Sequence, residues 1–389
     1  MNIFVLLSRI PWPLEKGDKL RAFHQIKNLS ACNTIHLCAL NDDSSVDKTL
    51  AFEKLKPYCQ TIDFIDIPKL TLPFNMLRAF LTGKPIQCGY FYNSRVHSRV
   101  HSLIKQYQPD VVYGQLVRVA PYLINEDVCK VVDYQDVLSY GMKRRMDAAT
   151  FYKRPIFKME YNRLQRYENQ VFEKFDVKTI ISDSDRQLIE HPKKNEIIVV
   201  PNGVDFERFV PRVSEKKYDI VFTGNMAYPP NVKAVCYLIS EIMPIVWKSL
   251  PNVSVCIAGA TPVPSVRAVA SDLVVVTGWV DDMCEVYSQS KIFIAPMQIG
   301  TGLQNKLLEA MAMELPCITT PLANKSLRAT ENEEILVGET PQDLANAIIY
   351  LLTDEKLAKS IAQKGSEFVR SHYDWKRTTA LLENAMLRI

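Results

Sequence analysis

The segment IGTGLQNKLLEAMAMELP, residues 299–316, begins as a glycine loop and continues as a largely apolar stretch whose only charged side chains before its end are Lys306 and Glu309. Its pattern after Gly302 is typical of a helix buried between layers. A helix that starts near Gly302 or Leu303 has Lys306 in its first turn, where a cation opposes the helix dipole by about 0.3–1 kcal/mol. A bound anion reverses that sign, and phosphate is the natural candidate because backbone N–H groups after Gly300 and Gly302 can cradle it.

Glu309 lies one turn after Lys306 on the same helix face, and two interpretations of the pair stay open. The two side chains can form a simple ion pair. Alternatively, Lys306 supports phosphate while the Glu309 carboxylate accepts two hydroxyl groups of a ribose. A Walker loop is excluded, because GxxxxGK[ST] is absent.

Two more glycine loops follow predicted strands of the same half of the chain, FTGNMAYPPN (222–231) and TGWVDD (277–282). Gly224 permits close backbone approach by a ligand, whereas Trp279 and Val280 offer contact to a planar base. As plain turns, both loops need no ligand.

The first half contains a third such loop, SRIPWPLEKGDKLR (8–21), with a helix starting near Gly17. Gly17, Asp18, Lys19 and Arg21 then lie at a strand end, either as ligand contacts or as part of a capped helix. Further along, VVDYQDVLS (131–139) places Asp133 and Asp136 after a strand. Each is either catalytic or a helix cap, a position that Asp favours.

Apolar β-branched runs alternate with helical patterns along the whole chain, which indicates parallel sheets flanked by helices. The first series of strands is predicted at 2–7, 34–40, 110–114, 130–134, 178–182 and 197–201. The second is predicted at 218–224, 252–259, 272–278, 291–296, 316–320 and 334–337. The Pro- and Gly-rich passage 201–217 separates the series. We therefore expect domains at 1–200 and 201–370, and a C-terminal helix at 371–389 that packs back towards the first domain.

Length and composition favour a soluble, two-domain cytoplasmic protein. The 389 residues, 47% hydrophobic, can bury two cores. Nine scattered cysteines without a CxxC pair indicate reduced thiols rather than disulfides or a zinc site. His97 and His101 lack a third ligand, so no metal site is predicted. The sequence shows neither a signal peptide nor an apolar run long enough for a membrane span.

Positive charge is concentrated in the first half, where residues 1–200 hold 29 Lys and Arg against 22 Asp and Glu. The stretch KRRMDAATFYKRPIFKMEYNRLQR (143–166) interleaves basic and aromatic residues. It is either a solvated helix face or a surface for nucleic acid, an anionic membrane or a phosphorylated substrate. The segment LTLPFNMLRAFL (70–81) is either a core helix or a second part of a membrane surface.

Together these motifs resemble the retaining glycosyltransferases of family 4, which have the GT-B fold. The resemblance spans nearly the whole chain and rests on PWPLEKGDKLRAFHQIKNL, IIVVPNGVDFERFVP, GNMAYPPNVKAV, AGATPVPSV, VTGWVDD, GTGLQNKLLEAMAMELP and the closing YDW. It is similar above all to sugar transferases of bacterial surface-polysaccharide and exopolysaccharide systems. The resemblance implies an α/β protein with two facing Rossmann-like domains, parallel sheets and an interdomain cleft.

The same resemblance implies a site for a nucleotide diphosphate sugar on the C-terminal domain, with Glu309 on the ribose and Lys306 on the departing phosphates. The implied donor-binding residues are Glu309, Gly300, Thr301, Gly302, Leu303, Gln304, Asn305, Gly224, Asn225, Trp279, Val280, Gly17 and Asp18. The implied catalytic residues are Lys306, Asp136 and Arg21. No cofactor or metal ion is implied.

The chain departs from the family pattern at four places. Thr301 stands eight residues before Glu309, where relatives carry a second glutamate, so Thr301, Gln304 or backbone amides must recognise the sugar. Asn225 stands where an arginine often follows glycine. Gln135 or Asp136 occupies the vicinity of a family histidine. Glu314 replaces a glycine expected at the helix C-terminus, at a cost of up to about 1 kcal/mol if its backbone is left-handed.

The sequence therefore predicts a retaining transferase that moves a sugar from a UDP- or GDP-sugar to a glycan or lipid-linked acceptor in bacterial polysaccharide or glycoconjugate synthesis. We expect the protein at the inner face of the cytoplasmic membrane, in peripheral contact with anionic lipid. We do not expect it to bind nucleic acid. Two alternatives share the fold: a nucleotide-sugar 2-epimerase and a non-catalytic donor-binding scaffold.

Overall fold

The computed structural model describes residues 1–300 and 302–388 and divides them into two α/β units. Unit 1 comprises Met1–Pro201 together with the C-terminal segment from Trp375. Unit 2 comprises Asn202–Asp374. The chain passes into unit 2 one residue after the predicted boundary, and residues 371–374 belong to unit 2 rather than to the C-terminal helix.

Unit 1 is built on a parallel sheet of seven strands in the order β3-β2-β1-β4-β5-β6-β7. The strands are β1 (Asn2–Leu7), β2 (Thr34–Asn41), β3 (Thr61–Asp66), β4 (Val111–Gln115), β5 (Cys129–Asp133), β6 (Val177–Ile180) and β7 (Ile198–Val199). All strands except β3 were predicted. The strand β3 was missed because its sequence, TIDFID, mixes carboxylates with apolar residues, and none of its side chains is fully buried.

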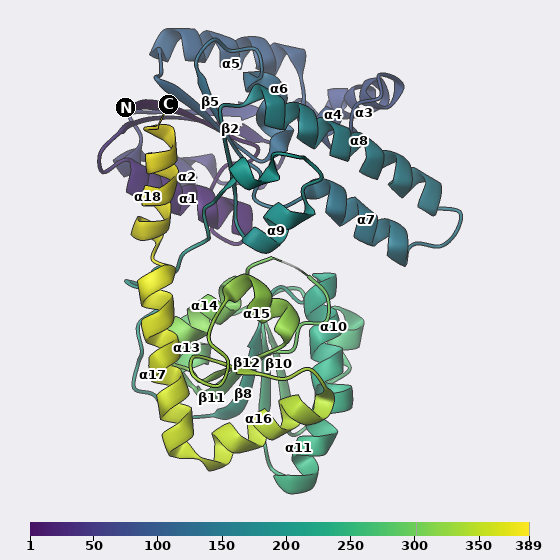
Figure 1. Ribbon diagram of the computed structural model, residues 1–389, viewed down its shortest axis with the longest axis vertical. Helices are drawn as coiled ribbons and strands as arrows, with labels where there is room; N and C mark the ends of the chain where they lie inside the picture. Colours follow the sequence, from purple (N-terminus) through teal and green to yellow (C-terminus); the bar gives the residue numbers. More distant parts are fainter. Residues whose placement is uncertain (301, 389) are drawn as a thin grey trace. The chain divides into compact units, whose positions relative to one another are not determined.

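The helices of unit 1 cover both faces of this sheet and enclose two apolar cores. They are α1 (Gly17–Leu29), α2 (Lys48–Leu55), α3 (Leu72–Leu81), α4 (Ile86–Phe91), α5 (Ser94–Tyr107), α6 (Ala120–Leu123), α7 (Leu138–Ala148), α8 (Arg154–Lys174), α9 (Asp183–Leu188) and α18 (Trp375–Met386). The last helix, α18, runs beside α1 (Figure 1) and adds Leu382 to the core that contains Ile26. The Trp375 indole stacks on the His24 ring at 4.9 Å.

Unit 2 has a parallel sheet of six strands in the order β10-β9-β8-β11-β12-β13. The strands are β8 (Tyr218–Thr223), β9 (Val255–Ala258), β10 (Val274–Gly278), β11 (Ser290–Ala295), β12 (Cys317–Thr319) and β13 (Leu336–Val337). The helices are α10 (Pro229–Tyr237), α11 (Met243–Ser249), α12 (Pro264–Arg267), α13 (Met283–Ser288), α14 (Asn305–Ala312), α15 (Pro321–Leu327), α16 (Pro341–Thr353) and α17 (Glu355–His372). Counted within the unit, this strand order is 3-2-1-4-5-6, the Rossmann arrangement.

Helix α14 starts at Asn305, two to three residues later than predicted, and ends in a Schellman motif. The N–H of Leu315 donates to the carbonyl of Ala310 at 3.1 Å, and the N–H of Glu314 donates to Met311 at 3.1 Å. Glu314 has a φ of +54°. The left-handed backbone expected at this position is therefore confirmed, and it occurs with a residue that bears the Cβ penalty.

Two exposed features project from unit 1. Helices α7 and α8, joined by residues 149–153, form a hairpin (Figure 1) that we call the basic hairpin, residues 138–174. Helix α3 and the turn before it carry apolar side chains outwards, with Leu70 of the turn 96%, Phe74 67% and Leu81 72% exposed. The interpretation of 70–81 as a core helix is therefore wrong, because only Ala79 of this helix is buried.

Candidate functional site

The candidate site of unit 2 lies at the carboxyl edge of its sheet, where the strand order reverses between β8 and β11. Open parallel sheets bind ligands beyond the carboxyl ends of their strands at this switch point. Gly224 directly follows β8, and the loop that leads into α14 follows β11. The fold therefore brings together the two segments that the sequence singled out.

Two glycines allow the loops after β8 and β9 to touch. Gly224 has a φ of +151° and Gly259 a φ of +144°, values that L side chains rarely adopt. A Cβ on Gly259 would lie 1.7 Å from the carbonyl oxygen of Gly224, and a Cβ on Gly224 would lie 2.6 Å from the Asn231 side-chain nitrogen. Any side chain at either position would displace this backbone, so the close approach at the sheet edge requires glycine.

Lys306, the second residue of α14, turns its ammonium group towards this glycine contact. The Nζ atom donates to Asn231 Oδ1 at 2.5 Å, lies 4.4 Å from the centroid of the Phe222 ring and 3.9 Å from Met297 Sδ. A Cβ on Gly224 would come within 3.4 Å of it. The neighbours of the cation are thus an amide, an aromatic face and a thioether.

The electrostatics of this environment disfavour the charged lysine. Burial lowers the pKa of Lys306 to about 7, although Glu309 acts in the opposite direction. Among the described residues, no carboxylate lies within ion-pair distance of Lys306 Nζ. The simple Lys306–Glu309 ion pair that the sequence left open is therefore not formed, and the cation lacks a counter-charge.

Glu309 is held by a separate set of contacts. The Tyr287 hydroxyl donates to Glu309 Oε2 at 3.0 Å and lies 2.9 Å from Thr223 Oγ1 at the end of β8. Burial raises the pKa of the Glu309 carboxyl to about 7, with Tyr287, Arg208 and Lys306 acting in the opposite direction. One carboxylate oxygen is thus engaged by Tyr287, and Oε1 accepts no hydrogen bond from the described residues.

The loop before α14 is fixed by short polar contacts. Gln304, the N-cap residue, donates its side-chain amide to the Gly302 carbonyl at 2.9 Å. Asn305 accepts a hydrogen bond of 3.1 Å from the Asn202 side chain, and Leu303 packs against the core. Gly300 has a φ of +104° and lies next to Pro230. Thr301, which the sequence placed at the donor sugar, lies outside the described residues.

The predicted base-binding segment follows β10. Trp279 is 61% exposed and donates its indole N–H to Asp281 Oδ1 at 2.8 Å, whereas Val280 packs against the core. After β8, Asn225 accepts from Ala227 N at 2.9 Å in a tight turn. Neither contact occupies the face of the indole, and the binding roles of Trp279, Val280 and Asn225 stay predictions.

The four remaining site residues belong to unit 1, and Arg21 among them does not fit its predicted role. Its side chain has no exposed surface and forms a bidentate pair with Asp133, at 2.6 Å from Nε to Oδ2 and 3.2 Å from Nη2 to Oδ1. Thr179 and Tyr113 also donate to the Asp133 carboxylate, at 2.9 and 3.3 Å. Direct contact between Arg21 and a substrate is therefore wrong, and the residue joins α1 to the sheet.

Gly17, Asp18 and Asp136 lie at the carboxyl edge of the first sheet. Gly17 starts α1 with open space around its Cα, and the Asp18 carboxylate accepts from Arg9 at 3.1 Å. The side chain of Asp136 is exposed, and desolvation by its surroundings together with the carboxylate of Asp185 raises the pKa of its carboxyl group. A raised pKa suits a carboxyl group to proton exchange closer to neutral pH. Its catalytic role stays a prediction.

Sequence reasoning missed several residues that complete the site in unit 2. They are Asn231, Tyr287, Thr223 and Gly259. Asn231 was part of the quoted loop 222–231, and the double proline before it places it at the start of α10. Tyr287 gave no signal, because a tyrosine in a short helix is usually a core residue.

The described residues contain no group of three or more His, Cys, Asp or Glu that could hold a metal ion. In the same part of the chain, no helix combines the length and apolar character that a membrane span needs.

The fold and the site define a class of protein. Two Rossmann-type units in one chain, with a glycine-lined edge, a half-buried lysine and a carboxylate beside the switch point of the second, are the architecture of the GT-B fold. Residues 217–354, which contain this site, match the family described as glycosyl transferases group 1.

Two known proteins illustrate what the chain is similar to in sequence. The chain is 22% identical over 400 residues to an uncharacterized 44.6 kDa protein in the cps region of Klebsiella pneumoniae, covering 97% of both chains. It is 25% identical over 244 residues to a phosphatidyl-myo-inositol mannosyltransferase of Mycobacterium tuberculosis, a match that covers 58% of this chain and 63% of the relative.

Solved structures support the fold along the full length. Sucrose-phosphate synthase from Thermosynechococcus elongatus superimposes with a TM-score of 0.71 at 15% identity, covering 100% of this chain and 99% of that one. Anabaena Alr3699/HepE in complex with UDP and glucose superimposes with a TM-score of 0.71 at 11% identity, covering 99% of both. The chain is a glycosyltransferase of the GT-B fold, and its residues 217–354 are similar to the group 1 family.

Proposed function

We propose that this glycosyltransferase is a retaining enzyme that transfers a sugar from a UDP- or GDP-sugar to a glycan or lipid-linked acceptor in polysaccharide or glycoconjugate synthesis. The observation that carries the proposal is the environment of Lys306. A lysine whose neighbours are an amide, an aromatic ring and a thioether needs an anion to complete its surroundings. The start of α14 presents N–H groups at the same place.

A nucleoside diphosphate supplies that anion. In this proposal the diphosphate lies against Lys306 and the N-terminus of α14, where Gly224 leaves room for it. The Glu309 oxygen not engaged by Tyr287 accepts the ribose hydroxyls, and the exposed Trp279 face contacts the base. Structures with bound UDP among the similar proteins, Alr3699/HepE and a TarM mutant, favour a nucleotide donor.

The proposed reaction breaks the bond between the anomeric carbon and the diphosphate oxygen. The acceptor hydroxyl forms its bond to the same carbon, on the face that the nucleotide leaves, and its proton passes to the departing phosphate. Negative charge develops on the diphosphate during bond cleavage. Lys306 and the α14 N–H groups stabilise that charge. The proposal invokes no metal ion.

A turnover assay of Lys306→Ala tests this role. We expect turnover to fall on the order of 100-fold or more, the scale for removing one preorganised charge-stabilising group. Lys325→Ala is the matched control, because Lys325 is an exposed helix lysine of the same unit. A near-normal rate in Lys306→Ala contradicts the assignment.

The product of the reaction separates the alternatives. A transferase consumes donor only when an acceptor is present and releases nucleoside diphosphate in equal amount to the new glycosidic bond. An epimerase releases an isomerised sugar without acceptor. A donor-binding scaffold binds the nucleotide and turns over nothing, even with crude glycolipid extract from a polysaccharide-producing bacterium as acceptor.

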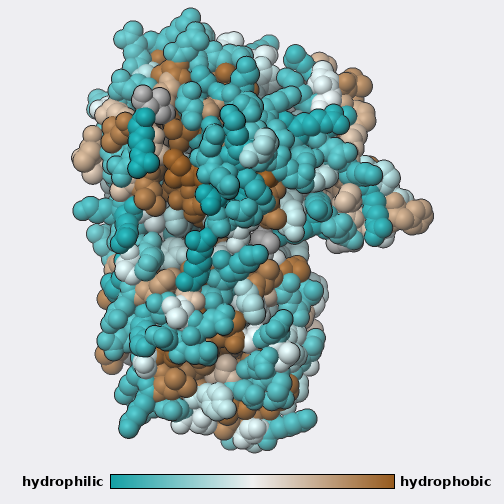
Figure 2. Space-filling view, viewed as in Figure 1, coloured by the Kyte–Doolittle hydropathy of each residue, from teal (hydrophilic) through white to brown (hydrophobic). Residues whose placement is uncertain are grey.

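We further propose that unit 1 contacts an anionic membrane at the cytoplasmic face. Phe151, Tyr152 and Ile156 are exposed on the basic hairpin, and Figure 2 shows apolar side chains at its tip and over α3. The Arg163 guanidinium lies over the Phe80 ring at 5.0 Å, so the hairpin and α3 form one surface. Aromatic residues beside Lys and Arg are suited to a lipid interface.

Vesicle sedimentation tests this surface. We expect the Lys143→Ala, Arg144→Ala, Arg145→Ala triple variant to lose most binding to vesicles containing anionic lipid, since each basic residue near such a surface contributes about 1 kcal/mol. A control variant removes equal charge from exposed positions of unit 2, Lys248, Lys325 and Lys356. Unchanged binding of the triple variant contradicts the membrane contact.

A further inference from the structure

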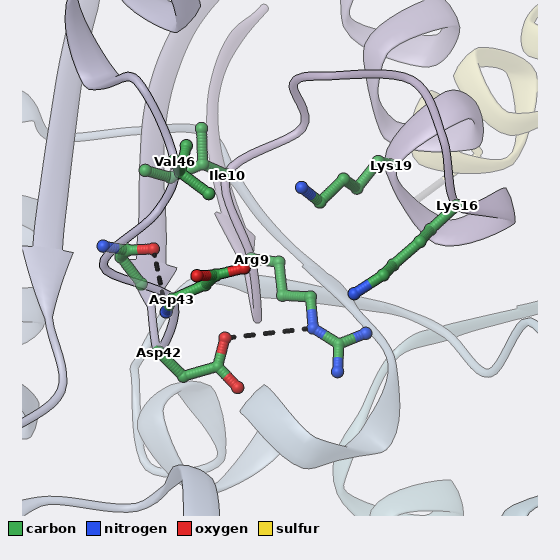
Figure 3. A pocket seen from close by; sticks show the side chains of 8 residues that line it. Arg9, Ile10, Lys16, Lys19, Asp42, Asp43 and Val46 are labelled. Carbon is green, nitrogen blue, oxygen red and sulfur yellow. Dashed lines mark hydrogen bonds and ion pairs between the residues drawn. The ribbon is translucent and has the colours of Figure 1, made fainter. Parts of the chain in front are cut away.

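Unit 1 contains a small cavity that the donor site does not explain. Its volume is about 250 Å³, and it lies at the carboxyl ends of the neighbouring strands β1 and β2. The lining residues are Arg9, Ile10, Lys16, Lys19, Asn41, Asp42, Asp43 and Val46 (Figure 3). At the lower end of the usual size of ligand pockets, it has room for one sugar or one phosphate rather than a nucleotide.

Three of the lining side chains are cations, and Lys19 is the least satisfied of them. Lys19 is 8% exposed, and the one hydrogen bond that its Nζ makes among the described residues is 3.4 Å long, to the Trp12 carbonyl. Burial lowers the pKa of Lys19 and the charge of Lys16 lowers it further, whereas the carboxylates of Asp18 and Glu15 act in the opposite direction. Within the described part of the chain, neither lysine has a carboxylate within ion-pair distance.

The nearby carboxylates do not neutralise these lysines. Asp18 pairs with Arg9 at 3.1 Å, and Asp42 approaches Arg9 at 4.0 Å on another side. Asp43 accepts hydrogen bonds from Ser45 at 2.6 and 3.0 Å. Figure 3 shows the tips of Lys16 and Arg9 directed towards each other, with Asp42 beyond Arg9. The cavity therefore has a cationic side made by the lysines and an acidic side made by Asp42 and Asp43.

We propose that this cavity binds the acceptor through a sugar that carries an anionic substituent, a phosphate or a carboxylate. The anion lies between Lys16 and Lys19 and relieves their mutual repulsion. Asp42 and Asp43 accept hydrogen bonds from the hydroxyl groups of the same sugar, since carboxylates are strong acceptors. The inference rests on the proposed transferase function, because it assigns the charge of the acceptor.

A neutral sugar fits this lining less well. It would leave the repulsion between the exposed Lys16 and the buried Lys19 without a neutralising anion. A bare phosphate would use the lysines but would face Asp42 and Asp43 without hydroxyl groups to bridge them. The combination of both charges within one small cavity therefore favours a ligand that has an anion and hydroxyls together.

Binding measurements on the full-length protein without donor test the proposal. The probes are glucose 1-phosphate, methyl glucuronide, methyl glucoside and inorganic phosphate. We expect at least one of the first two to bind tenfold or more tightly than methyl glucoside and inorganic phosphate. Preference for glucose 1-phosphate identifies a phosphate substituent, and preference for methyl glucuronide identifies a carboxylate. Equal, weak binding of all four probes overturns the proposal.

Lysine variants test whether the anionic probe binds in this cavity. We expect Lys19→Gln and Lys16→Gln each to weaken the preferred anionic probe about tenfold, whereas Lys105→Gln, on the exposed face of α5, leaves it unchanged. UDP and GDP binding should persist in Lys19→Gln. A loss of nucleotide affinity in that variant would assign the cavity to the donor phosphates and overturn the proposal.

The proposed transferase function and this inference can fail separately. A protein that fails to bind nucleotide, or a Lys306→Ala variant with normal turnover, contradicts the proposed role of unit 2. Neither result changes the probe measurements on the cavity of unit 1. A protein that binds nucleotide but shows no preference for an anionic sugar keeps the proposed function and loses only the inference.

Discussion

In the proposed donor site, the half-buried Lys306 should make nucleotide binding depend on pH. Burial lowers the pKa of Lys306 to about 7, so above this pH the free protein holds mainly the neutral amine. A diphosphate favours the ammonium form, which means that binding must raise the pKa of Lys306. Nucleotide binding above pH 7 therefore takes up a proton from solution.

The size of the effect follows from this linkage. With a pKa near 7, Lys306 is about nine-tenths deprotonated in the free protein at pH 8 but mostly protonated in the complex, so binding takes up about 0.4–0.8 proton. A hydrogen bond to a charged group contributes about 1.5–3 kcal/mol, so the neutral amine binds ten- to hundredfold more weakly. Nucleotide affinity should fall about two- to fivefold between pH 8 and pH 9.

Glu309 titrates in the same region with the opposite consequence. Burial raises its pKa to about 7, so its acceptor strength towards ribose hydroxyls increases as pH rises through 7. Above pH 8 this carboxyl group is largely ionised in the free protein. Measurements at pH 8–9 therefore isolate the lysine.

Titration calorimetry of UDP and GDP in buffers of different ionisation enthalpy measures the proton uptake directly. Lys306→Arg keeps its charge throughout this range and should show neither proton uptake nor the loss of affinity. Lys306→Met should bind weakly at every pH. Flat affinity and no proton uptake in the wild-type protein would refute the reasoning from burial at Lys306.

Two further predictions concern stability. Glu314→Gly should raise the free energy of unfolding by about 0.5–1 kcal/mol and the melting temperature of unit 2 by about 1–4 °C, since Glu314 is left-handed at φ +54°. A lower melting temperature in calorimetry contradicts the strain at the end of α14. Arg21→Met should cost about 3–5 kcal/mol in urea unfolding, because it leaves Asp133 buried without its guanidinium partner. The folded Arg21→Met protein should still bind nucleotide. Loss of nucleotide binding in this variant would show that Arg21 contributes to the binding site.

The sequence predicted the two parallel sheets because their strands are apolar β-branched runs that end in Gly or Pro. It also located Gly224, Lys306 and Glu309, since strand ends and helix starts are local features. The strand β3 escaped prediction because an edge strand with Asp63 and Asp66 lacks a continuous apolar run.

Contacts between residues far apart in the sequence could not be predicted from local sequence patterns. The pairing of Arg21 with Asp133 joins residues 112 positions apart, and that of Lys306 with Asn231 joins residues 75 positions apart. Arg21 looked available for phosphate because only the tertiary structure shows that α1 turns it into the sheet. The sequence of helix α3 is as apolar as that of a core helix. Only the tertiary structure shows that no element in the described part of unit 1 buries its apolar face.

The central claim is that Glu309 and Lys306 form a nucleotide site, and the ribose provides its most direct test. Calorimetry should compare UDP and GDP with their 2′,3′-dideoxy analogues on the wild-type protein and on Glu309→Gln. One ribonucleotide should bind the wild-type protein about ten- to hundredfold more tightly than its dideoxy analogue, the scale of a hydrogen bond to a carboxylate, and Glu309→Gln should lose most of that preference. Binding of neither nucleotide, or an equal ribose preference in Glu309→Gln, would contradict the account.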